Sequence, residues 1–386
     1  MTPGARVAAA IECLDQILSG APAEKVLTSW ARASRFAGSG DRRAVRTHVF
    51  TALRQRRSAA WLGGAETGRA LMIGSLLQQG ADLSSLFNGV GHAPPPLTSD
   101  EATTRSLEGP PDPVRLDWPD WLWERAEKSL GDQTQAVLER LRHRANVYLR
   151  ANLGKTTVTD AVQRLASDGI ETEAHPLSPT ALKVTSGETK LRASSAYNDG
   201  LVELQDAASQ AVIDRLAAHT NPTSVLDACA GGGGKSLGLA ARFRDARIVA
   251  HDANPARMND LPARAARAGA RIEVLTDPEG TFDLVLCDVP CSGSGAWSRS
   301  PEGKWRLDAA MLDDLLATQA GILDRFSAHV APTGTLAYVT CSLLDDENSE
   351  QIQRFVERAP EWRLADEARW LPTQGGDGFY LAILTR

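Results

Sequence analysis

The second half of the chain alternates short apolar runs with amphipathic helical stretches, and this alternation constrains the fold more than any other feature. The pattern continues from Leu201 to the C-terminus, with apolar runs at residues 225–228, 247–252, 271–275, 283–288 and 335–340. Strands that alternate with helices usually pair in parallel, because each helix carries the chain back across the sheet. The sequence therefore predicts an α/β fold with a mainly parallel sheet and helices on both faces.

The first ~90 residues show helical spacing alone. Apolar side chains recur at Val7, Ile11, Leu14 and Leu18, and again at Val45, Val49, Phe50 and Leu53. The second group predicts a helix with Asp41 as its N-cap and with the arginines of Arg42 to Arg46 on the solvent side. We expect an all-α domain in this region.

A proline-rich stretch separates this region from the rest of the chain. Residues 91–113 hold six prolines among serine, threonine and acidic residues, which predicts an extended linker. Helical spacing returns at 119–144, and it is followed by a strand at 147–152, a helix at 158–167 and a strand at 181–185. The predicted divisions are a helical domain (1–92), a linker (93–115), a helical connection with a small α/β subdomain (116–199) and an α/β domain (200–386).

The charge is unevenly distributed along the chain. The net charge is −6, but residues 1–70 hold 11 Lys+Arg against 5 Asp+Glu, a local charge of +6 that leaves −12 for the remainder. A basic region at one end is compatible with an RNA contact surface there. A solvated, arginine-rich helix face explains the same charge equally well.

Cysteine usage and hydropathy exclude several classes of protein. The five cysteines are odd in number and lack C-x-x-C spacing, and the histidines do not cluster beside them, so neither a disulfide framework nor a metal site is predicted. No apolar run approaches the ~18 residues of a membrane span. Because residues 1–10 show no export signal, we expect a cytoplasmic protein, and nothing demands more than a monomer.

A glycine-rich turn follows the first strand of the α/β domain. It reads Cys229-Ala230-Gly231-Gly232-Gly233-Gly234-Lys235-Ser236, and such a turn at the carboxyl end of a strand predicts a ligand-binding loop. A phosphate loop requires glycine where Cys229 stands, which disfavours triphosphate binding and leaves a purely structural turn as an alternative. Asp252, 25 positions beyond Asp227, suits the hydroxyls of a ribose, although a capping aspartate has the same pattern.

Two cysteines stand where strands end among polar, turn-forming residues. Cys291 lies in Asp288-Val289-Pro290-Cys291-Ser292-Gly293, and Cys341 lies in Thr340-Cys341-Ser342. Because parallel strands end at one edge, both thiols should emerge beside the glycine turn. Buried cysteine normally behaves as a small hydrophobe, which is our interpretation of Cys229 and Cys287. The turn positions of Cys291 and Cys341 favour reactive thiols.

These segments resemble the RNA cytosine-C5 methyltransferase superfamily, and the chain as a whole resembles its bacterial RsmB (Sun/Fmu) group, which methylates 16S ribosomal RNA. The matching motifs are the Pro-Cys and Thr-Cys turns, Glu347-Asn348-Ser349, and Gly376 to Phe379 as the closing strand. The resemblance implies a Rossmann-like, S-adenosylmethionine-dependent methyltransferase domain, a NusB-like all-α N-terminal domain and a small α/β RNA-binding subdomain. The family usually has Ala-Pro where this chain has Gly231-Gly232, so a looser cofactor loop is expected.

The resemblance also implies roles for individual residues. Cys341 would be the nucleophile that adds to carbon 6 of cytosine, Cys291 would assist release of the product, and Asp288 would hydrogen-bond the cytosine edge, helped by Lys235. The residues that would hold S-adenosylmethionine are Cys229, Ala230, Gly231, Gly232, Gly233, Gly234, Lys235, Asp252, Asp277 and Asp288. Of these, Asp277 would face the adenine. Asp277 taken alone is equally well explained as a turn aspartate.

Further residues are candidates for RNA contacts, and other functions fit parts of the same pattern. Lys304 and Arg306 could meet RNA phosphates, and Trp297 or Trp305 could stack on a base, with core packing as the alternative for the tryptophans. A DNA cytosine-C5 methyltransferase is disfavoured, because those enzymes use the Pro-Cys thiol and lack the Thr-Cys partner. The same chemistry on transfer RNA, and a non-catalytic RNA-binding assembly factor, remain alternatives.

Overall fold

The computed structural model describes residues 1–102 and 106–386, which form two compact units. The helical unit comprises residues 1–144 and 297–306, and the α/β unit comprises residues 145–296 and 307–386. Residues 103–105, inside the predicted linker, lie outside the described residues. Over the described ranges, no helix is long and apolar enough to cross a membrane. Within the same ranges, no group of three or more His, Cys, Asp and Glu side chains could hold a metal ion.

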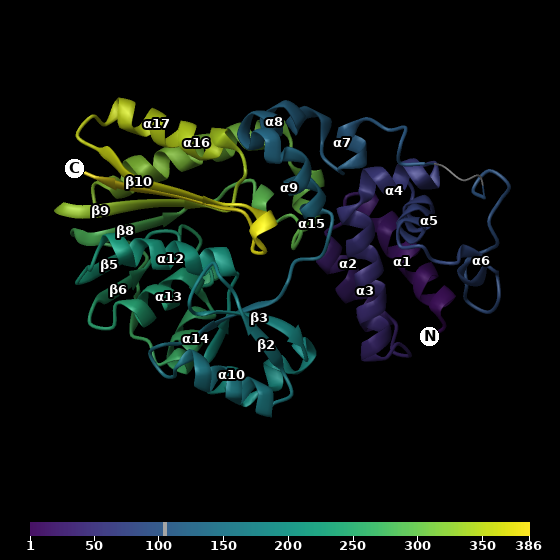
Figure 1. Ribbon diagram of the computed structural model, residues 1–386, viewed down its shortest axis with the longest axis horizontal. Helices are drawn as coiled ribbons and strands as arrows, with labels where there is room; N and C mark the ends of the chain where they lie inside the picture. Colours follow the sequence, from purple (N-terminus) through teal and green to yellow (C-terminus); the bar gives the residue numbers. More distant parts are fainter. Residues whose placement is uncertain (103–105) are drawn as a thin grey trace. The chain divides into compact units, whose positions relative to one another are not determined.

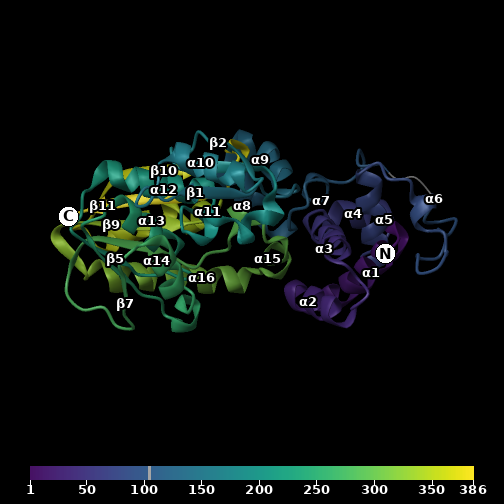
Figure 2. The ribbon, with the colours of Figure 1, turned by 90° about the horizontal axis from the view of Figure 1, so that it is seen from below.

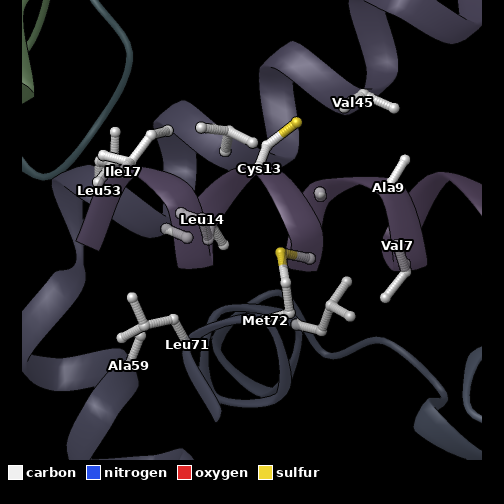
Figure 3. Close-up of a cluster of buried hydrophobic side chains, with 14 of the residues drawn as sticks. Val7, Ala9, Cys13, Leu14, Ile17, Val45, Leu53, Ala59, Leu71 and Met72 are labelled. Carbon is white, nitrogen blue, oxygen red and sulfur yellow. The ribbon is translucent and has the colours of Figure 1, made fainter. Parts of the chain in front are cut away.

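The helical unit is built mainly from α-helices (Figure 1). They are α1 (Pro3–Leu18), α2 (Ala23–Ala33), α3 (Ser39–Arg54), α4 (Arg56–Gly63), α5 (Gly68–Gln78), α6 (Leu83–Leu86), α7 (Asp112–Arg115), α8 (Trp123–Leu130), α9 (Thr134–Leu141) and α15 (Pro301–Arg306). Apolar side chains of α1, α3, α4 and α5 meet in one buried cluster, which includes Cys13, Leu14 and Met72 (Figure 3). The apolar spacing of α1 and α3 thus forms the core that the sequence predicts.

The predicted N-cap of α3 is wrong. The helix begins at Ser39 after the N-cap Gly38, so Asp41 occupies the third helical position. Its carboxylate accepts the N–H of Gly38 at 3.1 Å and pairs with Arg6 and with the amino group of Met1. An acid at the third helical position accepts a hydrogen bond from the backbone N–H of the N-cap residue, whereas an acid at the N-cap accepts one from an N–H of the first helical turn. The sequence does not distinguish these two positions.

The segment Trp297–Arg306 packs inside the helical unit, and this corrects two predicted RNA contacts. Lys304 is only 1% exposed, and its ammonium donates to the carbonyl of Arg54 at 3.3 Å. Burial lowers the pKa of Lys304 to about 8. Trp297 is buried against Trp118, with ring centroids 4.9 Å apart, so it takes the core alternative. Neither Lys304 nor Trp297 can reach an RNA strand from these positions.

The other two residues of that prediction differ from them. Trp305 is partly buried and donates its indole N–H to the carbonyl of Leu53 at 2.6 Å. Arg306 is exposed and pairs with Glu302 at 3.2 Å. Of the four predicted contacts, Arg306 alone presents a charged group to solvent.

The α/β unit begins with a four-stranded antiparallel sheet. The strands are β1 (Tyr148–Ala151), β2 (Glu171–Ala174), β3 (Ala181–Ser186) and β4 (Val202–Leu204), in the order β2-β3-β1-β4, with α10 (Val158–Ser167) and α11 (Ser195–Asn198). The predicted strands and helix coincide with β1, β3 and α10 to within a residue or so. β2 and β4 were not predicted, because β2 is mostly exposed and β4 is three residues long.

A seven-stranded sheet forms the larger part of this unit, in the order β10-β11-β9-β8-β5-β6-β7. Its strands are β5 (Ser224–Asp227), β6 (Arg247–Ala250), β7 (Ile272–Val274), β8 (Phe282–Asp288), β9 (Val330–Thr340), β10 (Arg363–Trp370) and β11 (Phe379–Thr385). The first five are parallel, and β11 pairs antiparallel with both β9 and β10. The α/β fold class is therefore confirmed, with one strand, β11, running against the others near one edge.

Helices cover both faces of this sheet (Figures 1 and 2). Apolar residues of α12 (Ala207–His219) and α13 (Gly234–Arg242) pack on one face, and those of α16 (Ala309–Ser327) and α17 (Ser349–Arg358) pack on the other. The helix α14 (Leu261–Ala268) lies between β6 and β7 in the sequence. Because both faces are covered, open space for a ligand remains at the carboxyl ends of the strands.

Candidate active site

Two cysteine loops meet at the carboxyl edge of the large sheet. The parallel strands β8 and β9 are adjacent, with Asp288 in register with Val339, so the segments that follow them start at the same edge. Cys291 comes three residues after β8, and Cys341 directly follows β9. Their Sγ atoms lie 3.4 Å apart. The structure thus brings together the two thiols that the sequence singles out.

A buried carboxylate, Glu347, ties the two cysteine loops together. It is 0% exposed and accepts the N–H of Ser292 at 2.8 Å and the hydroxyl of Ser292 at 2.5 Å. It also accepts the hydroxyl of Ser342 and, from α16, the amide of Gln319 at 3.0 Å. A buried charge is costly unless several donors satisfy it, and here each loop supplies donors from the residue that follows its cysteine.

Further hydrogen bonds extend this network beneath the thiols. Asn348 accepts from the hydroxyl of Thr340 at 2.6 Å and donates to the carbonyl of Ser342 at 3.1 Å. The hydroxyl of Ser294 accepts the N–H of Leu343 at 2.8 Å. The two bonds of Asn348 hold the loop that carries Cys341, and the bond between Leu343 and Ser294 crosses to the loop that carries Cys291, so buried polar groups help to set the separation of the two thiols.

Three cysteines of the α/β unit are held as thiols. The hydrogen bond to Cys341 and burial hold the pKa of Cys291 well above its usual range, so Cys291 stays a thiol at neutral pH. Burial also raises the pKa values of Cys229 and Cys287. These two follow the interpretation as small buried hydrophobes rather than as nucleophiles.

Lys235 and Asp288 form the charged part of the site. The Lys235 ammonium lies 2.7 Å from the Asp288 carboxylate and 4.8 Å from the centroid of the Phe379 ring. Lys235 is buried near the start of α13, whereas the Asp288 side chain stays partly exposed at the end of β8. The pair therefore presents an oriented carboxylate, backed by a cation, at the edge where the cysteine loops emerge.

A second, deeply buried acid lies beside this pair. Asp227 ends β5 and accepts the hydroxyl of Ser236 at 2.6 Å. Its other oxygen has no hydrogen-bond partner within the described part of the chain. Burial raises the pKa of Asp227 to about 7, with a further rise from nearby Asp288. Asp227 is therefore protonated over much of the acidic range, unlike an ordinary surface aspartate.

The glycine turn requires glycine at two of its four positions. Gly231 and Gly233 have φ values of +51° and +77°, a region that favours glycine. A Cβ at Gly233 would also lie 2.2 Å from a methyl carbon of Leu261. The turn holds its shape through the N–H of Gly231, which donates to Asp252 at 2.9 Å.

Arginines from the following segments cover this turn. Arg257, which is 57% exposed, lies 3.1 Å from the Asp252 carboxylate, and Arg264 donates to the carbonyl of Gly232. Asp252 is buried at the tip of β6, where its carboxylate could accept hydrogen bonds from the hydroxyl groups of a ligand. The exposed Arg257 can leave Asp252 without disturbing the core.

Asp277 differs from the other predicted cofactor residues. It follows β7, its side chain is 81% exposed, and it lies 3.4 Å from Arg325 of α16. The structure places Asp252 and Gly231 in direct contact but shows no such contact for Asp277 among the described residues.

Comparisons with known proteins decide the family. A family model described as 16S rRNA methyltransferase RsmB/F matches residues 214–385, and a model described as an RsmF/B-like, ferredoxin-like domain matches residues 118–189. Ribosomal RNA small subunit methyltransferase B of Cronobacter sakazakii is 31% identical over 286 residues, or 69% of this chain and 66% of that protein. The chain belongs to the RsmB/RsmF family. Members of this family are RNA cytosine-C5 methyltransferases that use S-adenosylmethionine.

Other relatives agree with this assignment. The protein of the same name from Photorhabdus laumondii is 30% identical over 285 residues, and both matches span just under two thirds of the curated relatives' length. The crystal structure of PH0851 is similar in fold, with a TM-score of 0.79 at 22% identity, and covers 100% of this chain and 99% of that one. NSun6 from Pyrococcus horikoshii has a TM-score of 0.61 at 15% identity, covering 69% of this chain and 98% of that one.

Sequence reasoning missed the roles of three residues in this RsmB/RsmF member. Glu347 was noted as part of a motif, but its pattern indicates neither burial nor a role in joining the cysteine loops. Gln319 lies within a long helix and carries no local signal at all. Arg257 could have been found, because an arginine five residues after Asp252 can turn back toward it at the start of the next helical segment.

Proposed function

We propose that this chain transfers a methyl group from S-adenosylmethionine to carbon 5 of a cytosine in small-subunit ribosomal RNA. The observation that carries the proposal is the pair of cysteine thiols, 3.4 Å apart at the ends of adjacent parallel strands. A cytosine methyltransferase needs one thiol to add to the base and a second group to help release it. The names of the relatives, ribosomal RNA small subunit methyltransferase B, support this choice of substrate.

Cys341 is the proposed nucleophile. Its sulfur forms a bond to carbon 6, and the electron pair of the carbon 5–carbon 6 double bond moves away from carbon 6, onto carbon 5 and the ring nitrogen conjugated with it. Carbon 5 thereby becomes nucleophilic. Cys291 is held as a thiol by the hydrogen bond to Cys341 and by burial, which supports assigning the nucleophile to Cys341. The base must be unpaired or turned out of a helix, because stacking hides carbon 6.

Asp288 and Lys235 orient the base and stabilise its reactive form. The carboxylate of Asp288 accepts hydrogen bonds from the ring edge and so favours the protonated, more electrophilic cytosine. Lys235, 2.7 Å from the same carboxylate, holds it in one orientation. This arrangement supplies the positioned charge that acts on the transition state.

The glycine turn and Asp252 are proposed to hold S-adenosylmethionine, with Cys229, Ala230, Gly231, Gly232, Gly233, Gly234 and Lys235 forming the cradle. Asp252 accepts from the ribose hydroxyls after Arg257 moves aside, and Asp277 and Asp288 line the same cleft. The bound cofactor supplies a methyl group on a sulfonium centre. Carbon 5 would take that methyl group and then lose its proton to solvent, and the electron pair of that C–H bond would re-form the carbon 5–carbon 6 double bond as the bond from carbon 6 to the Cys341 sulfur breaks. Cys291, held as a thiol 3.4 Å from that sulfur, would assist the release by donating a hydrogen bond to the departing thiolate.

The test is methyl transfer from labelled S-adenosylmethionine to undermethylated 16S RNA, with Cys341→Ala alongside. Label recovered as 5-methylcytosine with the native chain and not with Cys341→Ala supports cofactor, reaction and nucleophile together. Cys13→Ala serves as the matched control, because it removes a thiol buried in the helical unit. Label on transfer RNA alone would keep the chemistry and overturn the substrate. No label on any RNA would favour a non-catalytic assembly factor.

A covalent trap separates this proposal from a DNA-type mechanism. RNA containing 5-fluorocytosine cannot lose the group at carbon 5, so the enzyme stays attached through its nucleophile. Mass spectrometry of the trapped peptide should find the adduct on Cys341. An adduct on Cys291 would reverse the two roles.

A further inference from the structure

Arginines of α2 and α3 surround a hollow in the helical unit, a unit that contains none of the residues assigned to catalysis. Its volume is about 530 Å³. It is lined by Leu27, Thr28, Trp30, Ala31, Arg32, Arg42, Arg43 and Arg46, and we refer to it as the arginine groove. The two helices are joined by a short loop that contains Phe36 (Figure 1). The groove therefore combines an apolar floor with four guanidinium groups.

The positive charge of the groove is only partly neutralised. Arg46 pairs with Glu24, with a hydrogen bond of 2.8 Å. The side chains of Arg32, Arg42 and Arg43 form no ion pair or hydrogen bond within residues 1–102 and 106–386. Nearby Asp41 is already paired with the amino group of Met1 and with Arg6. Three exposed guanidinium groups thus face solvent without a counter-charge.

Exposed aromatic surface accompanies these cations. Phe36 is 76% exposed, and Trp30, on the groove wall, is partly exposed. Leaving an aromatic ring in water costs free energy that burial would recover, so such exposure beside a charged groove points to a ligand with flat apolar faces. RNA bases have such faces, and the phosphates between them match the planar fork of arginine.

We propose that the arginine groove binds a single-stranded segment of the substrate RNA, with phosphates on Arg32, Arg42 and Arg43 and bases stacked on Phe36 and Trp30. The inference rests on the proposed function, since it takes RNA as the substrate, and it adds a second RNA-binding site. An acidic protein surface would match the charge but would leave the aromatic rings without flat partners. The groove recognises backbone and shape, so it contributes affinity rather than choice of the target cytosine.

The main test is the full-length variant Arg32→Gln/Arg42→Gln/Arg43→Gln. Its affinity for undermethylated 16S RNA and for oligocytidylate RNA should fall at least tenfold. The dependence of log K on log salt should flatten by about 2, since each single-strand phosphate contact contributes roughly 0.7. The KM for RNA should rise while kcat at saturating RNA stays within about twofold, because the groove contains no residue of the reaction centre. Phe36→Ala should weaken binding roughly tenfold without changing the salt dependence.

A charge-matched control uses arginines that are paired on the surface of the α/β unit. The variant Arg325→Gln/Arg354→Gln/Arg358→Gln removes the same charge from α16 and α17 and should leave RNA affinity within about twofold. The side chains of the three substituted arginines form no ion pair or hydrogen bond within the described residues, so the test variant should melt like the native chain. Unchanged RNA affinity and salt dependence in the test variant would overturn the proposal. Polyglutamate serves as a probe for an acidic protein surface, and a variant that loses binding to polyglutamate but keeps its affinity for RNA would also overturn it. Because binding is measured without methylation, failure of the proposed reaction leaves this test intact.

Discussion

The cysteine loops and the glycine turn meet at the same edge of the large sheet, but they are held in different ways. The cysteine loops rest on Glu347, a buried carboxylate whose donors come from both loops and from α16. The glycine turn is covered by Arg257 and Arg264, whose side chains extend from the surface. A buried network resists rearrangement, whereas surface ion pairs contribute little and exchange readily. The groups that react with the base are therefore preorganised, and the cofactor side can open.

The largest effect should come from the thiol pair itself. Cys291→Ala removes the group assigned to product release but leaves Cys341 and Glu347 in place. We expect an adduct between enzyme and RNA that survives denaturing electrophoresis and becomes a major fraction of the enzyme during turnover. Cys341→Ala and the double variant should give none. An adduct that turns over at the native rate would show that another group performs the release.

Breaking the buried network should come next. Glu347→Ala leaves the donors of Ser292 and Gln319 unsatisfied, so we expect a loss of about 2–4 kcal/mol in the free energy of unfolding and a fall in kcat of roughly 100-fold. KM for both substrates should change little, because Glu347 is fully buried and exposes no surface to a ligand.

Two further variants test whether the effect of Glu347→Ala comes from the lost hydrogen bonds. Glu347→Gln keeps one accepting oxygen and should lose roughly tenfold in kcat, between the native chain and Glu347→Ala. The matched control is Glu357→Ala, which removes an exposed carboxylate from the same helix region. If Glu347→Ala lowered stability but left the rate of 5-fluorocytosine trapping intact, the network would be purely structural.

Asp227 should make the free energy of unfolding depend on pH. Its pKa is raised to about 7 in the folded chain, so the folded state keeps the proton that an unfolded aspartate loses near pH 4. This contribution to stability is present in acid and is lost as pH rises toward 7. The free energy of unfolding of the native chain, minus that of Asp227→Asn, should fall over this window by up to about 1.4 kcal/mol per pH unit and level off above pH 7. Urea unfolding of both proteins from pH 4 to 8 tests this, and a flat difference would contradict the raised pKa.

The smallest effect should come from the glycine turn. Gly232→Pro restricts the open loop before the cofactor binds, so calorimetry should find the affinity for S-adenosylmethionine raised about two- to fivefold. Gly231→Ala should act in the opposite direction, because φ is +51° there and alanine is strained. Weaker binding in Gly232→Pro would mean that the turn needs the freedom of glycine at that position as well.

The local patterns predicted much of the α/β unit. The strands β1, β3, β5, β6, β7, β8 and β9 follow from short apolar runs, and the parallel arrangement of β5 to β9 follows from the helices that alternate with them. The convergence of Cys291 and Cys341 could also be predicted, because the direction of parallel strands determines which edge their ends share. The edge strand β10 was not predicted because none of its residues is buried, and β11 was expected only through the resemblance. The N-cap of α3 was placed three residues late.

The sequence by itself determined the fold class, the edge at which the thiols gather and the family. Only the tertiary structure decided which charged residues are buried. Lys304 and Glu347 have the local setting of surface residues, yet one is enclosed beside Arg54 and the other beneath the cysteine loops. Periodicity reports which face of an element is apolar, whereas burial of a charge depends on donors brought from distant parts of the chain, such as Gln319 for Glu347. Those partners exist only once the chain has folded.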